Sequence, residues 1–298
     1  MRNLATTLAL TTAAAPVLLA PSPATAASPR HAASGPSYEA PGLRYVALGD
    51  SFTSGPLIPR QHGLVGCLRS DHNYPSLLAA SLRARLTDVS CTGADTGDMT
   101  HPQFTATGFN RAQLDAVTRD TDLVTLGVGG NDIGFTQMVV TCATESLRAP
   151  LGAPCARHYG TSIDKQIAKT APKVAKVLRG IHTRAPHARV LLVGYTRILP
   201  DTTGCWPLVP FSAGDVPFLN TTERKLNDML KKTAAANGAT FVDTYAGATG
   251  HDVCAPPASR WVEGMLPSHK AAPAHPNELG MRQIAARVRS ALTTTADR

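Results

Sequence analysis

Short apolar segments alternate along this chain with longer segments of helical periodicity. The apolar runs have the length of strands and cover 43–48, 88–91, 122–128, 189–193 and 240–243. Apolar residues recur at helical spacing over 74–86, 112–119, 163–183, 222–236 and 277–292. Apolar strands that alternate with helices are typical of a parallel sheet covered on both faces. The pattern therefore predicts one α/β domain, a three-layer α/β/α sandwich with a five-stranded parallel sheet.

The first 41 residues differ from this pattern. Arg2 precedes an apolar stretch over 4–20, and the segment that follows ends in Ala24-Thr-Ala26. This order is typical of a secretory signal peptide cleaved after Ala26. A membrane anchor is the alternative, but the run is short for a membrane span and contains Pro16. We expect a signal peptide over 1–26, a flexible lead-in over 27–41, a single domain over 42–298 and a secreted, extracellular protein.

Six cysteines remain after the expected cleavage site. An even number in a secreted protein indicates disulfides, and no pair has the C-x-x-C spacing of a zinc site. Six cysteines allow fifteen pairings. Pairing neighbours along the chain gives the set that we expect: Cys67–Cys91, Cys142–Cys155 and Cys205–Cys254.

The basic charge does not indicate a nucleic-acid partner. The formal net charge is +8, but Lys and Arg are spread along the helical segments. Aromatic residues make up only 5% of the chain, and no basic block is interleaved with them. This distribution favours a solvated surface, with at most peripheral contact with lipid surfaces or with anionic polysaccharide.

Three residues with useful chemistry follow expected strands. Ser51 follows the first strand in YVALGDSFTSG, Gly93 follows the second in CTGAD, and Asn131 follows the third in GVGGNDIGF. In an open α/β sheet, ligands bind outside the carboxyl ends of the strands. We therefore expect these residues to meet at one edge of the sheet.

Together with a histidine, these residues suit acyl transfer. Ser51 offers a nucleophilic hydroxyl, and His275, in PAHPNELG before the last helix, offers a general base. The Gly93 amide and the Asn131 side chain offer donors for a developing oxyanion. Each residue alone has a simpler explanation, such as a helix cap, a turn or a surface position. The combination is what favours a hydrolytic site.

The sequence resembles the SGNH (GDSL-type) hydrolases in four blocks. They are GDSF at 49–52, Gly93 in its loop, GGND at 129–132 and HPN at 275–277. The resemblance spans residues 43–292. The expected signal peptide and the six cysteines make the chain similar to the secreted Streptomyces-type lipases and esterases of that superfamily.

This resemblance implies a flavodoxin-like fold and a serine hydrolase that needs neither a metal nor an organic cofactor. Ser51 would be the nucleophile, and His275 would be the general base and then the acid. The oxyanion hole would consist of the backbone N–H groups of Ser51 and Gly93 and the side chain of Asn131. Asp50 would brace the turn that carries the serine.

The chain departs from the usual family pattern at one place. The family has an Asp three residues before the His, and Ala272 occupies that position here. By analogy with relatives that use a backbone carbonyl, the carbonyl of Ala272 would orient His275. The alternative carboxylates are Asp252, Glu263 and Asp243. His269 is an alternative base, but it lacks the Pro-Asn that follows His275.

The expected substrates are carboxylic esters of acyl glycerides or phospholipids. The alternatives are a carbohydrate (acetyl or feruloyl) esterase and a binding module without activity. Apolar residues in two irregular stretches would line an acyl-chain site or simply pack the loops: Leu57, Ile58, Leu64, Val65, Trp206, Leu208, Val209, Phe211 and Phe218. We expect a monomer that binds a small-molecule or lipid ester and no nucleic acid.

Overall fold

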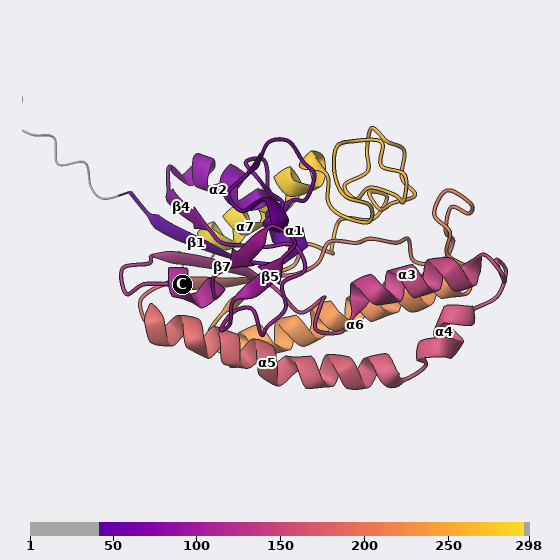
Figure 1. The fold of residues 1–298 in the computed structure, drawn as a ribbon, viewed down its shortest axis with the longest axis horizontal. Coiled ribbons are helices and arrows are strands. Elements are labelled where there is room, and N and C mark those ends of the chain that lie inside the picture. The colour runs from indigo at the N-terminus through magenta and orange to yellow at the C-terminus, as the bar shows by residue number, and fades with distance from the viewer. Residues whose placement is uncertain (1–41, 295–298) are drawn as a thin grey trace, which may run out of the picture. The chain divides into compact units, whose positions relative to one another are not determined.

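A five-stranded parallel sheet forms the centre of the computed structural model, which describes residues 42–294 (Figure 1). The strand order is β4-β1-β7-β8-β9. The bounds are β1 Arg44–Gly49, β4 Arg85–Asp88, β7 Leu123–Gly127, β8 Arg189–Val193 and β9 Thr240–Val242. The prediction of a five-stranded parallel sheet in an α/β fold is therefore confirmed.

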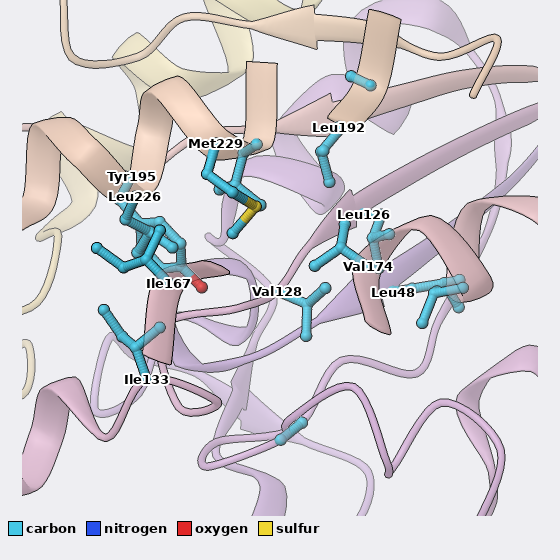
Figure 2. Close-up of a cluster of buried hydrophobic side chains, with 14 of the residues drawn as sticks. Leu48, Leu126, Val128, Ile133, Ile167, Val174, Leu192, Tyr195, Leu226 and Met229 are labelled. Carbon is cyan, nitrogen blue, oxygen red and sulfur yellow. The ribbon is translucent and has the colours of Figure 1, made fainter. Parts of the chain in front are cut away.

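Helices cover both faces of this sheet (Figure 1). Tyr45 and Ala47 of β1 pack on one face with the buried residues of α2 (Tyr74–Leu82) and α7 (Glu278–Thr294). Val46 and Leu48 pack on the other face with α5 (Ser162–Arg184) and α6 (Asp215–Ala236). Successive strand residues point to opposite faces, so an apolar strand can serve both layers. Figure 2 shows part of the second layer, where Leu48, Leu126 and Leu192 meet α5 and α6.

Smaller elements lie in the connections between these layers. The helices are α1 Ser51–Ser54, α3 Phe135–Ser146 and α4 Pro154–Tyr159, with 3-10 turns η1 Val65–Cys67 and η2 Gln113–Ala116. Two hairpins pair β2 Gln61–His62 with β3 Arg69–Ser70, and β5 Gln103–Thr105 with β6 Gly108–Asn110. Within residues 42–294, no helix is long and apolar enough to cross a membrane.

The second strand begins earlier than the expected 88–91. Leu86 continues the helical spacing of 74–86, but Arg83 adopts a left-handed conformation (φ 51°) and ends α2 at Leu82. The chain then enters β4, in which Leu86 lies opposite Tyr45 of β1. The prediction that the helix extends to residue 86 is therefore wrong, because the left-handed cap at Arg83 ends it earlier.

Other boundaries also differ from the expected ones. The segment 112–119 forms only the short turn η2, and α6 begins at Asp215 rather than at 222. The helix α3 was not predicted at all.

The three expected disulfides are present. They join Cys67 to Cys91, Cys142 to Cys155 and Cys205 to Cys254. The first anchors the loop that carries Gly93, and the third joins two connections on the carboxyl side of the sheet. The expected signal peptide and lead-in lie outside the residues that the structure describes.

Candidate active site

Ser51 begins a one-turn helix, α1, just after strand β1. Asp50 caps this helix, because its Oδ1 accepts a hydrogen bond from the Phe52 N–H at 2.9 Å. Its own N–H donates to the Gly127 carbonyl at the end of β7, also at 2.9 Å. At Gly49 (φ 153°) a Cβ would lie only 2.3 Å from the Thr53 hydroxyl oxygen. The close packing of two strand ends thus presents Ser51 at the carboxyl edge of the sheet.

The Ser51 hydroxyl contacts His275 although the two residues lie far apart in sequence. The distance from Ser51 Oγ to His275 Nε2 is 2.8 Å. His275 Nδ1 lies 2.7 Å from the carbonyl oxygen of Pro273, which can only accept a hydrogen bond. Nδ1 therefore carries the proton, and the Nε2 lone pair faces the hydroxyl. This geometry can remove a proton from Ser51 Oγ.

The expected role of the Ala272 carbonyl is wrong. The Ala272 carbonyl instead accepts the backbone N–H of His275 at 3.2 Å, which closes a turn. Ala274 lies within this turn in a left-handed conformation (φ 57°), and the Pro273 carbonyl faces the imidazole. The oxygen that orients the ring thus comes from two residues before the histidine rather than three.

The alternative carboxylates have other hydrogen-bond donors. Asp252 accepts from the Cys254 N–H at 2.9 Å, and Asp243 accepts from the N–H groups of two residues that follow it. Glu263 accepts from His269 Nδ1 at 2.7 Å. The alternative base His269 thus pairs with Glu263, whereas His275 pairs with the serine.

Asn131 lies beside the loop that carries Gly93. Gly49 and Gly127 are directly opposite each other in the sheet, so the turns after β1 and β7 start side by side. The Asn131 amide donates to the Ala94 carbonyl at 2.8 Å, which leaves its second N–H for another acceptor. The next residue, Asp132, accepts from the Thr96 N–H at 3.0 Å. Two neighbouring side chains therefore connect these loops.

Two backbone donors at this edge are free for a ligand. Within residues 42–294, neither the Ser51 N–H nor the Gly93 N–H has a hydrogen-bond acceptor. Gly93 has φ 82°, a conformation that favours glycine. These N–H groups and the Asn131 amide are the donor types of an oxyanion hole.

An apolar cavity of about 190 Å³ opens beside Ser51 and His275. Its walls come mainly from α3 (Phe135, Val139, Val140), from the segment after β8 (Tyr195, Ile198), and from Leu226 and Met265. None of the nine apolar residues expected for this role lines it. Ile58, Val209 and Phe211 are instead buried in the core, and Leu57, Val65 and Leu208 are exposed. α3 follows the Asn131 loop directly, which explains why it forms the wall.

Burial changes the proton affinity of His275 and of Asp50. Desolvation lowers the pKa of His275, although the hydrogen bond to the Pro273 carbonyl opposes this shift. The imidazole is therefore the free base at neutral pH. Desolvation raises the pKa of Asp50 to about 7, against hydrogen bonds from Tyr195 and from the Phe52 N–H.

The structure also brings in residues that the sequence analysis missed. Tyr195 and Asp132 both hydrogen-bond within the site, and both follow strands at the same edge as Ser51. Position after a strand was an available signal for each of them.

Comparisons with known proteins identify the family to which the chain belongs. Residues 47–283 match the GDSL-like Lipase/Acylhydrolase family. A protein named Lipase 2 from Streptomyces coelicolor is 43% identical over 261 residues, which cover 86% of this chain and 87% of that protein. An extracellular lipase from Streptomyces rimosus superposes with a TM-score of 0.70 at 28% identity, and a phospholipase A1 from Streptomyces albidoflavus with 0.72 at 26%. Each structural match covers 84% of this chain and 99% of the other. The chain belongs to the GDSL-like lipase/acylhydrolase family.

Proposed function

We propose that this protein is a secreted serine esterase or lipase that hydrolyses acyl glycerides or phospholipids through an acyl-enzyme on Ser51. The 2.8 Å contact between Ser51 Oγ and His275 Nε2 carries the proposal. The family assignment supports ester hydrolysis, and the named lipases and phospholipase among the similar proteins support acyl-lipid substrates.

In the first half of the reaction, Ser51 Oγ attacks the ester carbonyl carbon while His275 Nε2 takes its proton. The negative charge on the carbonyl oxygen would be stabilised by the N–H groups of Ser51 and Gly93 and by the Asn131 amide. The tetrahedral intermediate collapses as the C–O bond to the alcohol breaks. The imidazolium of His275 protonates the leaving oxygen.

In the second half, His275 takes a proton from a water molecule, and the resulting hydroxide attacks the acyl-enzyme. This attack forms a second tetrahedral intermediate. Its collapse releases the carboxylic acid, and His275 returns the proton to Ser51 Oγ. The Pro273 carbonyl would hold the imidazole in the same tautomer and orientation in both halves.

The cavity favours a substrate with an acyl chain over a substrate with a small polar acyl group. Its walls are mainly apolar, and burying each CH₂ group of an acyl chain contributes roughly 0.8 kcal/mol. A hydrolysis series of p-nitrophenyl esters from acetyl to palmitoyl tests this assignment. We expect a medium or long chain optimum, whereas activity on acetyl alone would favour the carbohydrate esterase.

Ser51→Ala and His275→Ala test the catalytic pair. Each is expected to reduce kcat on the order of 10⁶-fold. His269→Ala is the matched control, because this half-exposed histidine pairs with Glu263 and should leave kcat within about threefold. Unchanged activity in Ser51→Ala would overturn the proposal, and no activity of the wild type on any ester would favour the binding module.

Secretion is also part of the proposal. The A-x-A site, the three disulfides and the similarity to an extracellular lipase support it. Expression of the full chain in a secreting host should release a protein whose N-terminal sequence begins at Ala27. Retention with the membranes would contradict this assignment.

A further inference from the structure

The hydroxyl group of Tyr195 joins the two turns on which the candidate active site is built. Tyr195 follows β8 and is 5% exposed. Its OH donates to Asp50 Oδ2 at 2.5 Å and accepts from the Gly130 N–H at 2.7 Å. Because a backbone amide only donates, the Tyr195 hydroxyl accepts from Gly130, and its own proton points to Asp50 Oδ2.

Each partner of this hydroxyl is adjacent to a residue of the site. Asp50 precedes Ser51 and caps α1, and Gly130 precedes Asn131. The strand order places β7 between β1 and β8, so Tyr195 reaches the β1 turn across the end of β7. One oxygen atom therefore connects the turn of the nucleophile to the loop of an oxyanion donor.

Tyr195 is itself held firmly. Its N–H donates to Asn227 Oδ1 at 2.8 Å, and its carbonyl accepts from Asn227 Nδ2 at 3.0 Å. Its ring packs edge-on against Phe52, with centroids 5.1 Å apart and an interplanar angle of 73°. A Cβ at Gly130 would lie 3.0 Å from the Tyr195 hydroxyl oxygen, so only glycine fits without a shift. The hydroxyl cannot move without moving at least one of the two turns.

We propose that Tyr195 is a positioning residue that sets the separation between Ser51 and Asn131, and thereby the geometry of the oxyanion hole. This inference rests on the proposed function, because it assigns Asn131 to that hole. Tyr195 does so through Asp50 and Gly130.

Tyr195→Phe tests the inference, because it keeps the ring against Phe52 and removes only the bridging oxygen. The Gly130 N–H and the Asp50 carboxylate then lose a partner, and the two turns can separate. Misplaced oxyanion donors affect the transition state more than the bound ester. We therefore expect kcat to fall roughly tenfold with KM nearly unchanged.

Tyr45→Phe is the matched control. Tyr45 is fully buried, and its OH hydrogen-bonds to Thr125 Oγ1 at 2.7 Å within the sheet. It loses a buried tyrosine hydroxyl of the same kind without affecting the turns, so kcat should stay within about threefold. If Tyr45→Phe and Tyr195→Phe reduced kcat equally, the effect would be general destabilisation and the inference would be wrong.

A double variant with Asn131→Ala distinguishes positioning from independent damage. If Tyr195 acts through Asn131, the double variant should have nearly the kcat of Asn131→Ala alone. Multiplied losses would show that the tyrosine acts elsewhere. Gly130→Ala, which displaces the hydroxyl from the other side, replaces Tyr195→Phe if that variant does not fold.

The inference can fail without failure of the proposed function. If Ser51→Ala is inactive while Tyr195→Phe has the wild-type kcat, only the positioning role is overturned. If Ser51→Ala keeps wild-type activity, the proposed function itself is overturned.

Discussion

Ser51 and Asn131 lie in the turns that follow strands β1 and β7 of the sheet, whereas His275 lies in the long connection between β9 and α7. The paired strands β1 and β7 fix the two turns through backbone register, in which Gly49 lies opposite Gly127. The histidine segment, residues 243–277, contains no helix or strand in the described structure. Even so, it delivers the imidazole to within hydrogen-bond distance of Ser51.

Hydrogen bonds to a buried carboxylate, Glu263, hold this segment in place of strand pairing. Its side chain is fully buried and accepts from Ser268 N at 2.7 Å, from Asn277 Nδ2 at 2.7 Å and from His269. Its backbone N–H donates to the His275 carbonyl at 3.0 Å, and its carbonyl accepts from the Ala274 N–H at 2.9 Å. Backbone register thus positions one half of the site, whereas hydrogen bonds to the side chain and the backbone of Glu263 position the other.

After the loss of Ser51 or His275, Asn131→Ala should cause the largest fall in kcat. Loss of one oxyanion donor typically reduces kcat by ~10²–10³. Steady-state kinetics on the preferred ester measures it, and KM should change much less than kcat. A loss in kcat below roughly tenfold would remove Asn131 from the proposed oxyanion hole.

Glu263→Gln should weaken the histidine segment through its stability. Burial raises the pKa of Glu263, but hydrogen bonds from Asn277, His269 and Ser268 outweigh it and lower the pKa to about 2. Because the folded pKa lies below the unfolded value, the ionised group stabilises the fold above pH 4.5, and this contribution is lost as the pH falls toward 2. The variant should lose on the order of 3 kcal/mol of unfolding free energy at pH 7.

Urea unfolding of both proteins at pH 7 and at pH 3 measures this difference. The gap between wild type and Glu263→Gln should narrow at the lower pH. An equal gap at both pH values would show that the charge of Glu263 does not support the segment.

The lowered pKa of His275 should appear in the pH dependence of kcat/KM, as an effect smaller than those of the substitutions above. The base must be deprotonated, and desolvation lowers its pKa from 6.5. Activity should therefore rise along an acidic limb whose midpoint lies below pH 6.5. A midpoint near 7 would instead assign the controlling ionisation to Asp50, whose pKa is about 7.

Ser268→Ala should have the smallest effect. Its hydroxyl donates to Glu263 Oε2 at 3.0 Å, but the Ser268 N–H reaches the same oxygen at 2.7 Å. Thermal or urea unfolding should show a loss of about 1 kcal/mol, with kcat within twofold of the wild type. A larger loss of activity would mean that the histidine segment depends on single contacts rather than on the whole set around Glu263.

The same contrast explains what the sequence could predict. The apolar runs identify the strands, and the residues that follow them include Ser51, Gly93 and Asn131, because a parallel sheet gathers its strand ends at one edge. His275 was identified by its block, HPN, rather than by a periodic pattern. The backbone oxygen that orients it was assigned to Ala272 rather than Pro273, because the left-handed turn at Ala274 is a local conformation with no glycine to indicate it.

The cavity wall was not predictable for a different reason. Apolar residues of the irregular stretches after β1 and β8 were expected to line the cavity, but α3 forms its wall instead. Which apolar side chains face a cavity depends on the packing of whole elements, and the core takes up Ile58, Val209 and Phe211. Tyr195 likewise gains its role only from the strand order, which brings its hydroxyl between two turns.

Covalent labelling with a fluorophosphonate, followed by peptide mass spectrometry, tests whether Ser51 is a nucleophile activated by His275. Attack by an activated serine forms an O–P bond and expels fluoride, so the label records both the nucleophile and its activation. We expect rapid labelling of the peptide that contains Ser51, and very slow labelling of the same peptide in His275→Ala. Labelling at another residue, or equally fast labelling of Ser51 without His275, would contradict this expectation.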